Sequence, residues 1–330
     1  MLEAIRTNLP LESLSNISSI LGPIGLLALA DLSTVPLRTT LTGTSSWLDI
    51  FILAPGLHRQ ATAPDLTKGE YPACAAMTTG YVFRVENPAT VHYLQRVGKT
   101  GHVTTLFVTS SQETGARVSG SGLAYVSALL LSVSIPGIVV LVGDIVTTAV
   151  IGLLILSRLI NVSIIRRRAQ LGWFGALEPG VQSDLLVLLS QDRWFRIQGA
   201  TDDVKAITSG AWLRDATFLQ SSLVSFATLL VYISAAMSLN ATPAGKLALL
   251  LLFTGNAALL GLTNESTKTL TMFNRTISIK HAPRPYDRRL DLTKELVQEF
   301  KRTDCFVAMG MIQPEKEKEL QKSYKGAVMM

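Results

Sequence analysis

The sequence predicts an α-helical membrane protein that crosses the bilayer about five times and carries a small β-rich cytoplasmic domain. Its 330 residues are 48% hydrophobic and only 16% charged, whereas a soluble chain is about 25% charged. Residues 122–165 and 216–264 contain almost no charge. The basic residues, which leave a net charge of +6, cluster beside these apolar stretches, as membrane topology favours.

The longest apolar stretch, residues 122–165, predicts a helical hairpin. At about 1.5 Å per residue, one helix of this length would be about twice as long as the hydrocarbon layer is thick. We therefore expect spans near 122–141 and 145–165, joined by a turn at Gly143-Asp144, since glycine and aspartate favour turns. Arg158 is close enough to the predicted boundary for its side chain to reach the headgroups.

Residues 216–264 predict a second hairpin, with spans at 216–239 and 246–263 and a linker rich in turn-forming residues. A weaker apolar stretch, Ile17–Val35, is long enough to be a first span within the N-terminal segment 1–35. Trp47–Leu57 is too short to cross a bilayer and is predicted to be interfacial or buried.

The charge distribution predicts the orientation. Arg166-Arg167-Arg168 directly follows one apolar stretch, and basic residues follow the last one, while the turns near Asp144 and Asn240 lack basic residues. The positive-inside rule then places the C-terminus in the cytoplasm and the N-terminus in the lumen. We expect an integral protein of the endoplasmic reticulum or another endomembrane. The segments predicted to be cytoplasmic are 36–121, 166–215, 265–313 and the charged tail 314–330.

The predicted cytoplasmic segments contain patterns typical of strands and of one amphipathic helix. Apolar residues recur at helical spacing from Leu292 to Phe300, which predicts a helix over 290–301 that packs on the domain. The predicted strands are 81–86, 102–109, a hairpin of 184–190 with 194–198, and 276–280.

Several classes of chemistry lack support in the sequence. The four histidines are scattered, and Cys74 and Cys305 are far apart, so no metal site is predicted. No phosphate-binding loop or other cofactor motif is present in the sequence, and we expect no cofactor. Nucleic-acid binding is not expected, because no basic motif interleaved with aromatic residues accompanies the positive charge.

The predicted topology places carboxylates, arginines and tryptophans at one membrane face. Glu265 and Asp215, at the ends of the second hairpin, are the candidate general acids of a possible cyclase. The candidate substrate-binding residues are Arg193, Trp194, Trp212 and Arg214. Such groups could hold the polar head of an amphipathic ligand whose tail lies in lipid. The alternative is a belt of residues at headgroup level that only anchors the helices.

Four motifs carry a resemblance to a family. They are Trp173–Gly180, Gln191–Gly199, Thr208–Asp215 and Arg288–Leu292. Over about residues 120–312 the chain resembles a group of polytopic membrane proteins of filamentous fungi, some of them encoded in natural-product gene clusters. The resemblance implies no catalytic residue. It implies help in the cyclisation of polyketide or terpenoid chains.

Three functions are consistent with these patterns. The first is a membrane component of fungal natural-product biosynthesis that binds a lipid-like intermediate and assists its cyclisation, alone or with other pathway proteins. The second is a non-enzymatic scaffold that anchors soluble pathway enzymes to the membrane. A transporter fits less well, since the sequence shows neither inverted repeats nor broken-helix signals.

Overall fold

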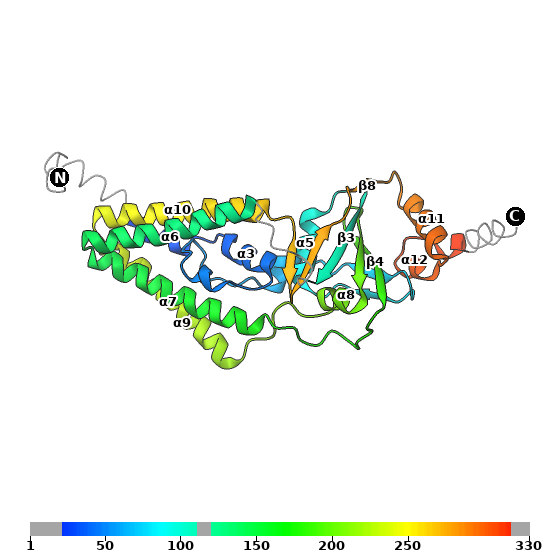
Figure 1. Cartoon of the computed structure of the whole chain (residues 1–330), viewed down its shortest axis with the longest axis horizontal. Helices are drawn as coiled ribbons and strands as arrows, with labels where there is room; N and C mark the ends of the chain where they lie inside the picture. The colour runs from blue at the N-terminus through cyan, green and yellow to red at the C-terminus, as the bar shows by residue number, and fades with distance from the viewer. Residues whose placement is uncertain (1–21, 111–119, 318–330) are drawn as a thin grey trace.

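The computed structural model describes residues 22–110 and 120–317, which form a helix bundle at one end and a sheet domain at the other (Figure 1). Four bundle helices are long and apolar enough to cross a membrane. They are α6 (Gly120–Val142), α7 (Ile145–Arg168), α9 (Phe218–Met237) and α10 (Pro243–Ser266). Many of their exposed side chains are large and apolar, whereas several polar side chains, among them Ser157, Asn161 and Asn256, are buried inside the bundle. Such a distribution suits a protein surrounded by lipid.

The turn predicted at Gly143-Asp144 is confirmed, and hydrogen bonds join it to the turn between α9 and α10. Gly143 has a φ of +79°, and the Asp144 carboxylate accepts hydrogen bonds from Thr147 N at 3.0 Å and Thr147 Oγ1 at 2.6 Å, which caps α7. The same carboxylate accepts a 2.5 Å bond from Thr242 Oγ1, the N-cap of α10. Gly245 allows this approach, because a Cβ there would lie 2.0 Å from Thr147 Oγ1. Asp144 therefore joins both turns at the end of the bundle.

The four helices pack mainly in pairs that are not neighbours in sequence. Tight turns join α6 to α7 and α9 to α10, but the closest packing is of α6 against α10 and of α7 against α9. The segment from residue 43 to residue 60 lies between these pairs, where Figure 1 shows it in blue. Asn256 Nδ2 on α10 donates to Leu53 O at 2.9 Å, and Gln60 Nε2 donates to Asn161 Oδ1 on α7 at 3.0 Å. The segment Trp47–Leu57, predicted to be interfacial or buried, is buried at Ile52, Leu53, Ala54 and Leu57 but exposes Trp47, Leu48 and Phe51.

A fifth span over Ile17–Val35 is not confirmed. Residues 17–21 lie outside the described residues, and the rest of this range is not one continuous helix. It forms the 3-10 helix η1 (Gly22–Leu29), a bend, and the start of α3 (Thr34–Thr42). Pro23 and Gly25 disfavour a regular α-helix, and η1 packs against α9 and α10 instead.

Arg158 does not reach toward the membrane surface as the sequence suggests. It points into the bundle, is 3% exposed, and donates from Nε to the carbonyl oxygen of Asp49 at 3.1 Å. Asp49 belongs to the 3-10 helix η2 (Trp47–Ile50), which packs on α7, so the acceptor lies beside the guanidinium.

One mixed sheet is assembled from three separate parts of the chain. Strand order is β2-β1-β4-β5-β3-β7-β6, with β8 also pairing β3, and within the described chain β3 and β5 form the parallel pair. The hairpin predicted over 184–198 is confirmed, with Gln191 and Asp192 at positive φ in its turn. The strands are β1 (Ala73–Ala76), β2 (Val82–Arg84), β3 (His102–Ser110), β4 (Gln182–Leu189), β5 (Arg193–Ala200), β6 (Leu270–Met272), β7 (Arg275–Ile279) and β8 (Arg284–Pro285).

Helices cover both faces of the sheet. Leu185 and Val187 of β4 point to the face covered by α5 (Pro88–Val97) and α8 (Thr201–Thr208), while Leu186 points to the other face. There α11 (Arg289–Phe300) and α12 (Asp304–Ala308) complete a second core. The helix predicted over 290–301 is thus confirmed, and it packs on the sheet. The short helix α4 (Ala63–Thr67) lies against α5.

The bundle and the sheet meet at the end of α3. Trp212 Nε1 donates to Gly43 O at 3.0 Å. Gly43 has a φ of +71°, and a Cβ there would lie 2.3 Å from Thr271 O of β6. Glycine therefore allows both the turn and the close contact with the sheet.

Candidate functional site

The six residues predicted for the site do not share one cavity. Trp194 is buried on the sheet face covered by α11, where its ring lies edge-on to Tyr286 at 6.4 Å. Arg193 donates from Nη1 to Gln95 O at 3.0 Å and from Nε to Ser190 O at 3.0 Å, at the turn between β4 and β5. Because consecutive residues of a strand point to opposite faces, Arg193 and Trp194 could not both face the membrane.

The other four lie near the end of the bundle that meets the sheet domain. Glu265 is 85% exposed and lies 3.6 Å from Arg96 Nη2. Arg214 Nη2 donates to Leu171 O at 2.7 Å. Trp212 and Asp215 line the same cavity, which is described below. The structure thus brings together two of the six, and the catalytic roles of Asp215 and Glu265 stay predictions.

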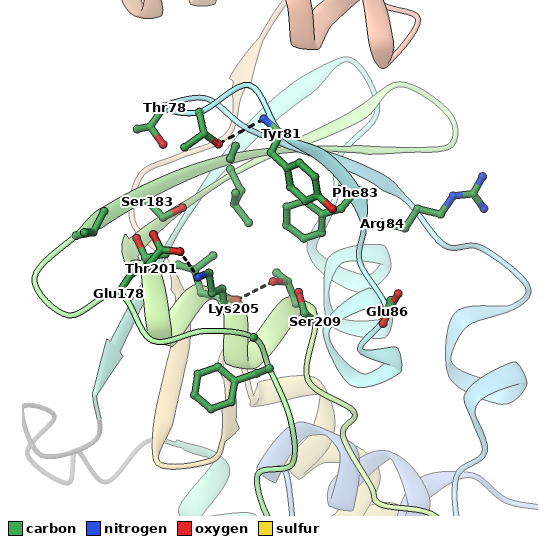
Figure 2. Close-up of a pocket in the computed structure, with 18 of the residues that line it drawn as sticks. Thr78, Tyr81, Phe83, Arg84, Glu86, Glu178, Ser183, Thr201, Lys205 and Ser209 are labelled. Carbon is green, nitrogen blue, oxygen red and sulfur yellow. Dashed lines mark hydrogen bonds and ion pairs between the residues drawn. The ribbon is translucent and has the colours of Figure 1, made fainter.

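A cavity lined by several aromatic side chains lies in the sheet domain; we call it the outer cavity (Figure 2). Its volume is about 480 Å³, within the usual range for small-molecule sites. The rings of Tyr81 and Phe83 stack at 5.8 Å on one side, and Leu185 and Val204 contribute apolar surface. A loop that contains Trp173 closes part of another side.

Polar groups of the outer cavity come from the β1–β2 hairpin, the loop before β4, the start of β4 and α8. Lys205 Nζ donates to Ala176 O at 3.0 Å and pairs with Glu178. Glu178 N in turn donates to Asp202 Oδ1 at 2.8 Å. These bonds hold the loop against α8, as the ion pair in Figure 2 shows. The serine and threonine side chains at the cavity are Thr78, Thr79, Ser183, Thr201, Thr208 and Ser209.

A second cavity, the inner cavity, lies between the bundle and the sheet domain. It has a volume of about 500 Å³, and its lining includes Arg168 at the end of α7 together with Trp212 and Asp215. Glu86 and Ser209 line both cavities. The two cavities are therefore adjacent, and together they extend from the membrane end of α7 into the sheet domain.

Glu86 can act as a proton donor or acceptor at the junction of the cavities. Its backbone N donates to Thr208 O at 2.9 Å, which fixes the main chain. Its side chain is exposed and makes no ion pair or hydrogen bond within the described residues, so it is free to meet a ligand.

Sequence reasoning did not identify Glu86, Lys205 or Ser209. The two helices that position them, α5 and α8, have 10 and 8 residues, too short for a strong periodic signal. A usable signal was the pattern of α8, in which Val204 and Ile207 are buried while Lys205 is not. No cluster of metal-ligating side chains occurs among the residues that the structure describes.

Cys74 does not take part in this chemistry. Its side chain is buried in the sheet core, and burial raises the pKa of the thiol, so little thiolate forms at neutral pH.

Comparisons with protein-family models, with curated proteins and with solved structures give no match for this chain. The resemblance to fungal membrane proteins stays a prediction.

Proposed function

We propose that this integral membrane protein binds a lipid-like small molecule in the outer and inner cavities. The observation that carries the proposal is that the two cavities are adjacent and share Glu86 and Ser209. The inner cavity begins at Arg168, at the end of α7 next to the sheet domain. An apolar compound dissolved in the bilayer could enter at this end. It would reach the aromatic lining of the outer cavity through the inner cavity.

The linings favour a ligand with an apolar body and a few polar groups. Tyr81, Phe83, Leu185 and Val204 suit a hydrocarbon or polyene chain. Hydroxyl groups of α8 and the Lys205–Glu178 pair suit carbonyl or hydroxyl groups of the same ligand. Polyketide and terpenoid intermediates have this mixed character.

We further propose a role in a fungal natural-product pathway, as the sequence resemblance implies, in which the protein assists cyclisation of such an intermediate. Cyclisation that starts with protonation of an olefin, epoxide or carbonyl needs an acid close to the ligand. Asp215 and Glu86 line the cavities, so they are the acids we propose. Glu265 lies outside both cavities, which makes it the weaker candidate.

A binding experiment tests the first proposal. The purified protein in lipid nanodiscs would be titrated with a dansyl-labelled C11 fatty acid, whose emission rises in an apolar site. We expect saturable binding that Ser209→Trp weakens at least about tenfold, since the indole would fill the junction of both cavities. Gln298→Trp, on the exposed face of α11, is the matched control and should bind as the parent does. Equal binding by both variants would refute the cavity assignment.

The pathway role has a separate test. A strain lacking the gene should accumulate a linear or partly cyclised precursor. Asp215→Asn or Glu86→Gln should reproduce that accumulation at a normal protein level. Unchanged products in the deletion strain would refute the biosynthetic role, even if the purified protein binds the fatty acid.

A further inference from the structure

The loop that closes the outer cavity begins at the membrane end of the bundle. Two hydrogen bonds join the end of α7 to the chain just before α9: Arg168 Nε donates to Arg214 O at 2.8 Å, and Arg214 N donates to Arg168 O at 3.1 Å. Arg214 Nη2 also donates to Leu171 O at 2.7 Å. Leu171 is therefore held beside the ends of two candidate spans, at the depth where the bilayer should end.

Residues 169–177, which we call the strap, leave this point with unusual side chains for a water-exposed loop. Trp173 is 80% exposed, and Phe218 and Leu219 at the start of α9 are also largely exposed. In membrane proteins tryptophan is enriched at the membrane–water interface, where the ring meets the acyl boundary and the indole N–H meets polar groups.

The strap begins beside a cluster of arginines. From Arg166 to Leu177 the sequence contains three arginines and no acidic residue. Arg167 and Arg214 are exposed, and no acidic partner pairs with either in the described part of the chain. Exposed arginines at this position attract anionic lipid headgroups by about 1 kcal/mol each.

The far end of the strap is attached to the sheet domain. Lys205 Nζ donates to Ala176 O, and Asp202 accepts from Glu178 N. Gly172 and Gly175 flank Trp173, and Gly175 has a φ of +100°, which a residue with a side chain rarely adopts. The strap is thus fixed at both ends, with Trp173 between the membrane edge and the outer cavity that it lines.

We propose that the strap lies on the bilayer surface, with the Trp173 side chain among anionic headgroups. The surface that it contacts is the lipid surface, because the strap continues directly from α7, begins beside the start of α9 and is flanked by the exposed arginines Arg167 and Arg214. One mouth of the outer cavity then opens toward the headgroup layer. The proposal requires that the bundle spans the bilayer but does not require a ligand, so its failure would leave the binding proposal intact.

Spin labels measure this directly. A nitroxide would be attached to Trp173→Cys in the full chain, reconstituted in vesicles of phosphatidylcholine and phosphatidylserine. Cys74 and Cys305 are both buried, and burial raises the pKa of each thiol, so neither should take the label. Tyr81→Cys is the matched control, since Tyr81 lines the same cavity from the β1–β2 side and is 69% exposed.

Oxygen, which concentrates in lipid, and a water-soluble nickel chelate would be used as relaxing agents. We expect collisions with oxygen to exceed those with the chelate severalfold at residue 173, and the reverse at residue 81. Replacing phosphatidylserine by phosphatidylcholine should lower the ratio of oxygen collisions to chelate collisions at residue 173 and leave that ratio unchanged at residue 81. A label at residue 173 that is as accessible to the chelate as the label at residue 81 would overturn the proposal. A label shielded from both agents would also overturn it, because a protein partner or the chain itself would then cover the strap.

Discussion

At the scale of single residues, the least expected feature is a charged group inside the bundle. Arg158 is about ten residues, or roughly 15 Å, from the end of α7, so it lies near mid-membrane depth. Its Nη1 has no hydrogen-bond partner among the described residues, which is costly for a buried cation. Asp49 lies close by: its carboxylate accepts from Tyr125 Oη at 2.6 Å and from Ser46 N at 2.7 Å. The negative charge of Asp49 attracts the positive charges of both Arg38 and Arg158.

We therefore predict that the negative charge of Asp49 stabilises the bundle through Arg158. Asp49→Asn keeps the shape and an oxygen acceptor but removes the charge, and should lower stability by roughly 3 kcal/mol. The loss should be clearly smaller in an Arg158→Met background, where one buried cation is gone. Thermal unfolding in detergent, monitored by intrinsic tryptophan fluorescence, measures both losses of stability. Equal losses in the two backgrounds would show that the charges do not interact.

His92 on α5 makes a second residue-scale prediction, on pH. Burial lowers the pKa of His92, and the positive charges of Arg96 and Lys68 lower it further. The unfolded chain then binds more protons than the folded one between the folded pKa and about 6.5, so stability must fall as pH drops through that range. His92→Gln should make the thermal midpoint less sensitive between pH 7 and pH 5. His58, whose pKa burial also lowers, will keep part of the effect.

The Glu70 carboxylate titrates outside this pH window. Burial alone would raise the pKa of Glu70, but hydrogen bonds from Ser190 and Gln95 lower it overall. Its stabilising contribution is lost only below an unfolded value of about 4.3. An unchanged pH profile in His92→Gln would therefore mean that His92 is not the titrating group.

At the scale of elements, the sequence was most informative where composition is extreme. The four long helices lie where uncharged stretches predicted spans, because lipid leaves few alternatives to a helix. The β4–β5 hairpin and α11 were also predicted, from strand residues around a turn and from helical spacing. The segment from Gly22 to Thr42 was not, because its apolar composition fits both a span and a 3-10 helix packed inside a bundle. Only the tertiary contacts distinguish these.

The helix α11 supports a prediction on the sheet domain. Leu296 is buried between α11 and the sheet, in the core that contains Trp194 and Phe306. Leu296→Asp should destabilise the domain by roughly 2–5 kcal/mol, since it removes apolar contacts and buries a charge. Gln298→Asp, exposed on the same helix, is the control and should stay close to the parent. Limited proteolysis would report the difference as faster cleavage within the domain. Equal protease resistance would mean that α11 is detached in solution.

At the scale of the whole molecule, distant segments build the site. The outer cavity combines residues from β1–β2, the strap and α8, and the inner cavity adds residues near Gln60. No local pattern could bring these together, because strand order in the sheet depends on pairings between segments about 100 residues apart. Chain topology alone predicted that Asp215 and Trp212 lie near the membrane. It could not predict that Trp194 lies on the other face of the sheet, away from Asp215 and Trp212.

The arrangement in Figure 1 also makes a prediction about sidedness. The end of α7, the start of α9 and the end of α10 all lie at the end of the bundle next to the sheet domain, while the turns at Asp144 and Thr242 lie together at the other end. If the bundle spans the bilayer, these two ends must be on opposite sides. The positive-inside rule assigns the sheet end, which follows Arg166–Arg168, to the cytoplasm.

Single cysteines and a membrane-impermeant maleimide can measure this in sealed microsomes. Gln170→Cys and Gln298→Cys report the sheet end, and Asn240→Cys reports the turn end; all three positions are exposed. In cytosol-side-out vesicles we expect the first two to react at once and Asn240→Cys to react only after detergent opens the membrane. The reverse pattern would keep the spanning bundle but invert the orientation, so that charge asymmetry would not govern this chain. Immediate reaction at all three positions would mean that the bundle does not cross the bilayer, because both ends would then face the same solution.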